Sequence, residues 1–307
     1  MTRAIVVSGL QKTFRQGFFM RRVEAVKGIT FHVEPGEIFG FLGPNGAGKT
    51  TTIKMLTGLI RKTGGSAQVF GHDVPSPQAM KNVGFLPENP YIYPYLTPRE
   101  FVTLAARLSG LSGDRLKKRV ESSLERTGIA YAADRQVRKL SKGMLQRTGL
   151  AAAMVSDPDL LLLDEPMSGL DPVGRKEVRD LILEEKRRGK TVFFSTHILS
   201  DVETLCDRVV ILRSGEAVVS GPVRELLHAD VRRVEITLRD VPADLEERFR
   251  KDGLRVENAG GNVVIEIEGD DKVPQVLALA LEAKARVLEV APRRETLENL
   301  FMRRAIG

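Results

Sequence analysis

The chain has 307 residues, of which 42% are hydrophobic and 28% are charged. These proportions are typical of a water-soluble globular protein, and the length is sufficient for one large domain and a smaller one. No run of eighteen apolar residues is present, which argues against a membrane-spanning helix, and the first ten residues lack the features of a signal peptide.

Charge and cysteine content narrow the class of protein further. The single cysteine, Cys206, excludes an internal disulfide framework and fits a reducing compartment, so we expect a cytoplasmic protein. The net charge is +7 and the pI is about 9.5, values that are compatible with a nucleic acid or an anionic membrane surface as partner. The basic residues are, however, dispersed in short pairs, often next to glutamate, which favours ordinary solvated surface.

Strands and helices alternate along the first three quarters of the chain. Residues 4–10 and 23–34 alternate apolar and polar side chains and predict an antiparallel patch, with Phe14 to Arg22 as the loop between them. Further strands are predicted at 37–42, 66–70, 83–86, 160–163, 191–195, 208–212 and 216–220. Helices are predicted after the strand at 37–42 and at 98–110, 114–127, 140–155 and 172–188. This alternation predicts a parallel α/β sheet covered on both faces, with a helical insert at about 88–157.

The order of predicted strands and helices changes near residue 228. A strand at 234–238, a helix at 243–251, strands at 254–257 and 262–268, a helix at 272–284 and a strand at 286–290 follow, and a closing helix is expected near 294–303. This order is β-α-β-β-α-β, as in ferredoxin-like domains. We therefore expect a large domain at 1–228 and a small α+β accessory or regulatory domain at 229–307.

A glycine-rich loop follows the strand at 37–42. It fits the phosphate-loop pattern G-x-x-x-x-G-K-[ST] at every fixed position, and a helical apolar pattern follows it. Such a loop directs backbone N–H groups and a helix N-terminus at an anion. Lys49 is expected to reach the β- and γ-phosphates of ATP and the Thr50 hydroxyl to bind Mg²⁺. The predicted ATP-binding residues of this segment are Gly43, Pro44, Asn45, Gly46, Ala47, Gly48, Lys49, Thr50 and Thr51.

An acidic pair ends the apolar strand at 160–163. Asp164 is expected to hold Mg²⁺, directly or through water, and Glu165 to accept a proton from the attacking water. The alternative is that both acids only cap a strand that Pro166 ends. The phosphate loop upstream favours the catalytic interpretation and a P-loop NTPase core.

Three further motifs resemble those of ATP-binding cassette (ABC) transporters. The segment Leu140-Ser141-Lys142-Gly143-Met144 is similar to the family signature LSGGQ, and Ser168 to Asp171 resembles its D-loop. His197 matches the switch histidine, and Phe14 is a candidate for the aromatic residue that stacks on adenine. The order and spacing of the motifs match the family from about residue 4 to 228.

The resemblance implies a head-to-tail homodimer that encloses two ATP molecules. Ser141, Lys142, Gly143 and Met144 would contact the γ-phosphate bound to the other subunit, and Asp171 would lie at the seam. His197 would report the γ-phosphate and assist Glu165 in catalysis. The family also implies membrane permease subunits as partners and a location on the inner face of the cell membrane.

Two features of the sequence, three residues in all, depart from the family pattern. Lys142 and Met144 stand where glycine and glutamine are usual, although Ser141 and Gly143 are retained. Glu88 stands where glutamine usually senses Mg²⁺ and water, and a carboxylate cannot donate a hydrogen bond as an amide does. We expect Glu88 to belong to the metal site with altered metal coupling. This variant also resembles subunits of the exporter branch.

Three of the four tyrosines, Tyr91, Tyr93 and Tyr95, lie within five residues among prolines. Either they are partly buried in the helical insert, or they form a contact surface for the permease, since tyrosine is favoured at interfaces.

Together, the motifs and the family resemblance predict an exporter-type ABC ATPase subunit with ATP and Mg²⁺ as cofactors. The alternative is a soluble ABC-type ATPase that acts on nucleic acid or the ribosome. No nucleic acid is expected, because the segment between Lys49 and Ser141 is too short for the coiled coils of DNA-repair relatives, and only one cassette is present.

Overall fold

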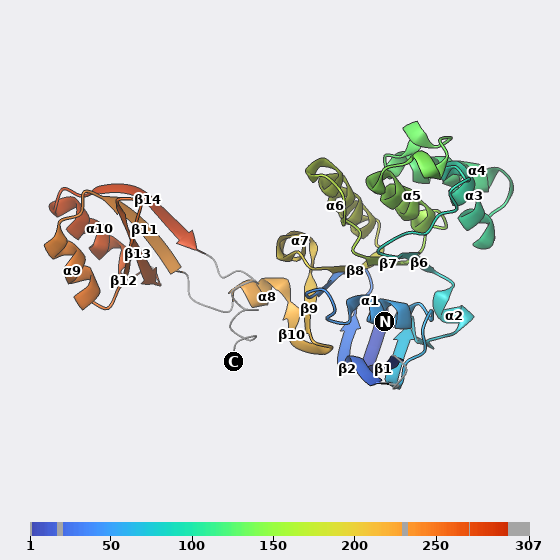
Figure 1. Ribbon diagram of the computed structural model, residues 1–307, viewed down its shortest axis with the longest axis horizontal. Helices are drawn as coiled ribbons and strands as arrows, with labels where there is room; N and C mark the ends of the chain where they lie inside the picture. The colour runs from blue at the N-terminus through green and yellow to red at the C-terminus, as the bar shows by residue number, and fades with distance from the viewer. Residues whose placement is uncertain (1, 17–20, 229–232, 270, 294–307) are drawn as a thin grey trace. The chain divides into compact units, whose positions relative to one another are not determined.

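The structure is a computed structural model that describes residues 2–16, 21–228, 233–269 and 271–293. The chain divides between Val223 and Arg224 into two compact units, slightly before the boundary expected at residue 228. Figure 1 shows the elements of each unit. No helix in the described part of the chain combines the length and apolar character needed to cross a bilayer.

A six-stranded sheet forms the centre of the first unit. Its strand order is β10-β9-β3-β8-β7-β6, and the five strands from β9 to β6 are parallel, as the sequence predicts. The strands are β3 (Ile38–Leu42), β6 (Val83–Leu86), β7 (Leu160–Asp164), β8 (Thr191–Thr196), β9 (Arg208–Arg213) and β10 (Glu216–Pro222). The helices that connect or follow them are α1 (Lys49–Leu56), α2 (Pro77–Met80), α6 (Pro172–Arg187), α7 (Leu199–Leu205) and α8 (Val223–His228).

The pleat of the apolar strand β7 separates two hydrophobic cores. Leu160 and Leu162 pack with the α1 side chains, whereas Leu161 and Leu163 pack under α5 and α6. Because successive side chains of a strand point to opposite faces, a run of four leucines indicates a strand that is covered on both sides. All five residues of β7 are buried, so the acidic end of this strand is held rigidly.

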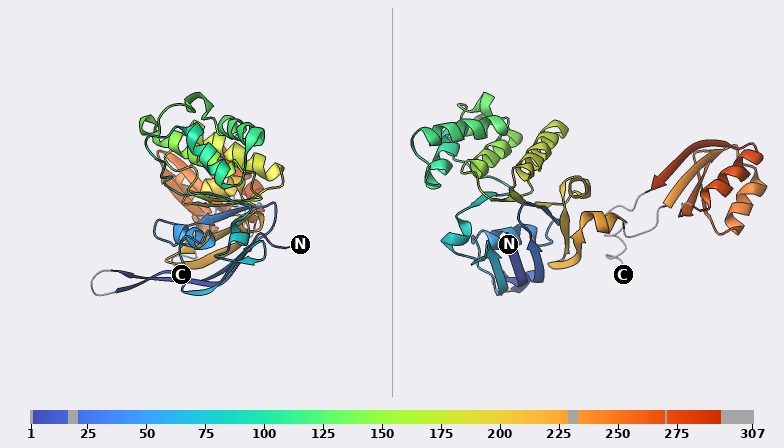
Figure 2. Two further views of the ribbon diagram at one scale, coloured as in Figure 1. Left: turned by 90° about the vertical axis from the view of Figure 1, so that its right-hand side faces the viewer. Right: turned by 180° about the vertical axis from the view of Figure 1, so that it is seen from behind.

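An antiparallel sheet with strand order β2-β1-β4-β5 lies on the α1 side of the unit. Its strands are β1 (Ile5–Gln16), β2 (Arg21–Val33), β4 (Gly64–Val69) and β5 (His72–Asp73). The prediction that Phe14 to Arg22 forms a loop is wrong at both ends. The ladder continues to the pairs Phe14–Val23 and Gln16–Arg21, and Figure 2 shows the resulting long hairpin. Both faces of this ribbon reach solvent, so no alternating pattern marks it in the sequence.

The helical insert contains α3 (Pro98–Leu108), α4 (Gly113–Arg126), the 3₁₀ turns η1 (Ala130–Ala132) and η2 (Val137–Lys139), and α5 (Lys142–Met154). Thr97 and Glu100 form a reciprocal capping box at the start of α3. Val102 of α3, Leu124 of α4 and Ala151 of α5 share one apolar cluster.

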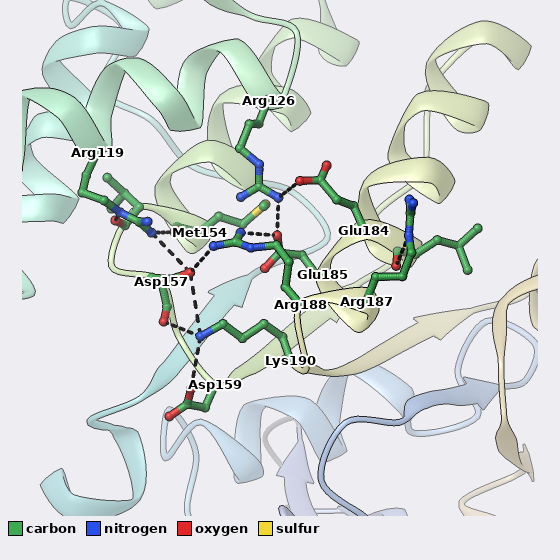
Figure 3. Close-up of polar contacts among 12 residues, drawn as sticks. Arg119, Arg126, Met154, Asp157, Asp159, Glu184, Glu185, Arg187, Arg188 and Lys190 are labelled. Carbon is green, nitrogen blue, oxygen red and sulfur yellow. Dashed lines mark hydrogen bonds and ion pairs between the residues drawn. The ribbon is translucent and has the colours of Figure 1, made fainter.

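A network of ion pairs fastens the insert to α6 and to the segments that flank β7 and β8 (Figure 3). Arg126 of α4 pairs with Glu184 and with the buried Glu185 of α6. Arg188 bridges Glu185 and Asp157, with N–O distances of 2.8 and 3.0 Å. The network therefore connects the insert, the sheet and α6 at the end of the sheet opposite to the acidic pair.

The second unit has the predicted order β11 (Arg233–Arg239), α9 (Ala243–Lys251), β12 (Arg255–Ala259), β13 (Asn262–Glu268), α10 (Val273–Glu282) and β14 (Arg286–Arg293). Its sheet is antiparallel with order β12-β13-β11-β14, which confirms the ferredoxin-like arrangement. Ile236 and Ile265 pack in one core with Phe249 of α9 and Val276 of α10. The closing helix expected at 294–303 lies outside the described residues.

Candidate functional site

The carboxyl ends of four parallel strands bring the predicted site residues to one edge of the central sheet. The phosphate loop follows β3, His197 follows β8, Asp164 ends β7, and Glu88 lies two residues after β6. Leu42 of β3 pairs with Thr196 of β8, and Ser195 of β8 pairs with Asp164 of β7. Strand β8 thus lies between the phosphate loop and the acidic pair.

The phosphate loop depends on glycine at two of its positions. Gly48 has a φ of +102°, and a Cβ there would lie 2.6 Å from the carbonyl oxygen of Ala25. A Cβ on Gly43 would lie 2.6 Å from the carbonyl oxygen of Leu212. The loop therefore closes tightly, and α1 begins directly after it at Lys49. Pro44, Asn45 and Gly46 are exposed, Ala47 is buried, and Thr50 and Thr51 are partly buried in the first helical turn.

Lys49 is buried and already positioned across the loop. Its Nζ donates to the carbonyl oxygen of Gly43 at 2.6 Å and lies 3.2 Å from Oε1 of Glu165. Nζ also donates to the carbonyl oxygen of Pro44 at 3.3 Å, so the three N–H donors of the ammonium group all face acceptors at the phosphate loop and the acidic pair, and an anion held by the loop would replace some of these contacts.

Ser195, which the sequence motifs did not identify, forms hydrogen bonds to both residues of the acidic pair. Ser195 Oγ donates to Asp164 Oδ1 at 2.6 Å and accepts the backbone N–H of Glu165 at 2.9 Å. Burial raises the pKa of Asp164, and the nearby charges of Glu88 and Glu165 act in the same direction, whereas hydrogen bonds from Ser195 and Thr50 oppose the rise.

Glu165 is placed for acid–base chemistry. Its Oε2 lies 3.0 Å from Nδ1 of His197, and its Oε1 is buried without a hydrogen-bond partner. The backbone of Glu165 has a φ of +49°, a left-handed conformation that non-glycine residues seldom adopt. Backbone strain of this kind is often found at functional sites.

Thr50, Asp164 and Glu88 supply oxygen ligands of the type that Mg²⁺ prefers. Burial raises the pKa of the Asp164 carboxyl, and a cation bound at this edge of the sheet would stabilise its charged form, whereas Oε1 of Glu165 already faces the Lys49 ammonium. Within the described residues, no group of three or more His, Cys, Asp or Glu side chains could hold a metal by itself. A magnesium ion here would take its remaining ligands from water and phosphate oxygens, as is usual for Mg²⁺.

The structure places the signature residues apart from the phosphate loop of the same chain. Ser141 is the N-cap of α5 and accepts the N–H of Met144 at 3.3 Å. Figure 1 shows α5 and α1 on opposite faces of the sheet. Lys142 packs along Gly169 and Gly143 lies near Leu170, so the signature contacts the D-loop of its own chain.

Asp171 and Phe14 have local partners. Asp171 caps α6 by accepting the N–H of Gly174 at 2.8 Å. Phe14 is partly buried on β1, with Lys12 Nζ 4.9 Å above its ring. It pairs with Val23 on β2, two residues before Ala25, whose carbonyl oxygen lies next to Gly48 of the phosphate loop, and the adenine-stacking role of Phe14 stays a prediction.

Two other buried polar residues, Gln146 and Asp201, were not identified from the sequence. Gln146 is 2% exposed and donates to the carbonyl oxygens of Glu165 and Pro166. Asp201 is 3% exposed, and burial raises its pKa in spite of Arg179. A polar residue in an alanine-rich buried helix was the only sequence signal for Gln146.

Comparisons with known proteins agree with this geometry. The family model described as ABC transporter matches residues 26–168. The chain is 37% identical over 282 residues to the Nod factor export ATP-binding protein I of Burkholderia thailandensis, and the match covers 91% of each chain. The chain belongs to the ABC transporter family.

This ABC protein is therefore an ATP-binding subunit and an ATP hydrolase, and the expected cassette fold is confirmed. It is 49% identical over 226 residues, or 73% of its length, to an uncharacterized ABC transporter ATP-binding protein of Nostoc, of which the match covers 68%. A solved structure of an ATP-binding subunit of an ABC transporter aligns with a TM-score of 0.65 and 30% identity, over 74% of this chain and 92% of the other. The nucleic-acid or ribosome alternative finds no support in these relatives.

Proposed function

We propose that two copies of this ATPase enclose ATP and Mg²⁺ head to tail, and that ATP hydrolysis drives export by separate membrane subunits. One observation carries the proposal. Lys49, Asp164, Glu165 and His197 converge at one edge of the sheet, whereas Ser141 and Gly143 lie on the insert, on the opposite face from α1. A second copy is needed to bring a signature to each phosphate loop, and twofold symmetry makes both sites equivalent.

The direction of transport is inferred from relatives. One similar protein is named for Nod factor export, and another, 35% identical over 91% of this chain, is a bacitracin transport ATP-binding protein of Bacillus licheniformis. By analogy with these relatives, we propose that this chain also takes part in export. The subunit would then lie at the inner face of the cell membrane, held there by its permease.

The residues of the site have separable tasks. Lys49 and the backbone N–H groups of the phosphate loop bind the phosphates, and Thr50 and Asp164, with Glu88 nearby, hold the metal. When bound, Mg²⁺ neutralises charge on the transferred phosphoryl group. Glu165 takes the proton of the attacking water, and His197 fixes the Glu165 carboxylate through its Nδ1 contact at 3.0 Å.

The test is a Glu165→Gln variant of the full chain. The amide keeps the shape but cannot act as a base, so the ATPase rate should fall by about 10²–10⁴-fold while ATP binding is retained. The variant should dimerise in ATP, because the amide also removes a negative charge from the proposed seam. Asp180→Asn, which changes an exposed carboxylate on α6, is the control. Hydrolysis by Glu165→Gln within a factor of two of wild type would contradict the assignment.

We also propose that the permease contacts the surface formed by Tyr91, Tyr93 and Tyr95. The three side chains are 81%, 59% and 74% exposed, which does not favour the partly buried alternative. The rings of Tyr91 and Tyr93 meet edge to face at 6.2 Å. Beside them lies a cavity of about 250 Å³, lined by residues that include Phe85, Pro90, Tyr91, Phe101 and Ala105. Of the three tyrosines, Tyr91 lines this cavity, and exposed tyrosines beside a hollow suit a protein partner.

The test replaces the three tyrosines with alanine. Each aromatic anchor at an interface centre is worth about 2 kcal/mol or more, so co-purification with the membrane partner should weaken at least about thirtyfold, while ATP binding is unchanged. Tyr131→Ala removes the fourth tyrosine, which is 73% exposed on η1, and should leave the complex intact. A lowered melting temperature with an intact membrane complex would show that the three tyrosines support the fold instead.

The second unit is proposed to be a regulatory or dimer-stabilising domain. No group of three or more His, Cys, Asp or Glu side chains that could hold a metal occurs in its described part, and its buried residues are apolar.

A further inference from the structure

Helix α5 carries a buried amide for which the machinery described above has no task. Gln146 is 2% exposed, and most of its neighbours on α5 that are equally buried are apolar or glycine. Its Nε2 lies 3.2 Å from the carbonyl oxygen of Pro166 and 3.4 Å from that of Glu165. A buried amide in a helix is retained only when its hydrogen-bonding groups are satisfied, and here the partners are the backbone of the catalytic base and of the next residue.

The backbone at Glu165 needs external support. Its φ of +49° is unfavourable for a non-glycine residue, and such a conformation persists only where its surroundings fix it. Ser195 holds the N–H of Glu165 on one side. On the other side, the Glu165 carbonyl accepts from Gln146 and from the N–H of Ser168. The hydrogen bonds from Gln146 connect this turn to the helical insert.

The same helix has close contacts on both sides of Gln146. Its N-terminal cap is Ser141, the proposed contact to the nucleotide of the second copy. Farther along, a Cβ on Gly149 would lie 2.8 Å from Leu86 and 2.9 Å from Pro90, so α5 packs closely against the segment that holds Glu88. A helix rises about 1.5 Å per residue, so Gln146 lies about two turns or less from either contact. One helix thus carries the signature, the amide that bonds the turn at Glu165, and the contact to the segment of Glu88.

We propose that Gln146 is a positioning residue that couples the signature helix to the catalytic base Glu165. The inference rests on the proposed dimeric ATPase, in which Ser141 senses the second copy's nucleotide. The side chain of Gln146 donates to the carbonyl groups of Glu165 and Pro166, so it acts through the backbone of the catalytic base. Its loss should therefore misplace the carboxylate and leave ATP binding intact.

The experiment compares Gln146→Leu with two other variants in the full chain. Gln146→His retains a ring N–H donor at similar reach. Thr148→Val is the matched control, because Thr148 is also fully buried on α5 but its hydroxyl bonds only to the carbonyl oxygen of Met144, at 2.8 Å. A misplacement of about 1 Å at a catalytic group can cost about 10²-fold in rate. We expect Gln146→Leu to lower kcat by about 10–100-fold with KM for ATP changed by less than about threefold, and Gln146→His to recover part of the loss.

A double mutant separates positioning from a structural effect. In a Glu165→Gln background the base is already absent, so adding Gln146→Leu should not lower the residual rate further, whereas independent effects would multiply. The inference is overturned if Gln146→Leu retains kcat within about twofold, if Thr148→Val loses as much activity, or if the two losses multiply. Failure of the proposed function itself would show differently, as undiminished hydrolysis by Glu165→Gln alone.

Discussion

Glu185 gives the sharpest test of how the insert is held to the core. Its side chain is 3% exposed and pairs with Arg126 of α4 and with Arg188, at 2.8 Å from the latter (Figure 3). The neighbouring Glu184 contacts the same Arg126 at 2.9 Å but is 45% exposed. Glu185→Gln and Glu184→Gln thus remove one carboxylate each from the same network, and the two carboxylates differ in burial and in the number of arginine partners, two for Glu185 and one for Glu184.

The burial and the remaining partners of these residues determine how much unfolding free energy each substitution should cost. Removing one partner of a buried ion pair costs about 3–5 kcal/mol. Arg126 and Arg188 are, however, 21% and 35% exposed and keep Glu184 and Asp157 as second partners, so we expect about 2 kcal/mol. For a unit of this size that loss lowers Tm by about 4–8 °C. Glu184→Gln should cost less than about 1 kcal/mol, as is usual for exposed pairs.

The assay is thermal unfolding of both variants at low and high salt. The effect of Glu184→Gln should shrink at high ionic strength, because exposed charges are screened more than buried ones, and the effect of Glu185→Gln should largely persist. Equal shifts of Tm in the two variants would refute the reasoning that burial makes Glu185 the central member of the network.

Three other outcomes are expected. Burial raises the folded-state pKa of Asp164 above its unfolded value, so the ionised carboxylate destabilises the nucleotide-free protein as pH rises through that pKa. Asp164→Asn should therefore have a higher Tm than wild type at pH 7.5, and the difference should vanish at acidic pH. The same variant should lose Mg²⁺-dependent hydrolysis. A Cβ on Gly40 would lie 2.7 Å from Sγ of Cys206, so Gly40→Ala should cost about 1–3 kcal/mol of stability, and Cys206→Ala should restore part of it in urea unfolding; a purely additive double mutant would contradict this contact. A chain that ends at His228 should fold and bind ATP in a calorimetric titration, and a folded truncation without nucleotide binding would disprove the accessory role of the second unit.

The local pattern of the sequence determined the parts of this protein that depend on near neighbours. The phosphate loop, the acidic pair after an apolar strand and the β-α-β-β-α-β order were all predicted. Each depends on spacing within one strand, turn or helix, and side-chain periodicity reports that spacing directly. The family resemblance added His197 and the signature, which geometry alone could not have assigned.

Only the tertiary structure decided which distant residues meet. Strand β8 lies between β3 and β7, and this order alone places Ser195 between Asp164 and the Glu165 N–H. The amide of Gln146 and the carboxylate of Glu185 are buried because α5 and α6 cover the sheet, and no periodicity distinguishes them from surface polar residues. Burial depends on which elements pack against each other, and the local sequence does not record this. For that reason the sequence alone could not show that the three tyrosines are exposed or that the hairpin extends past Phe14.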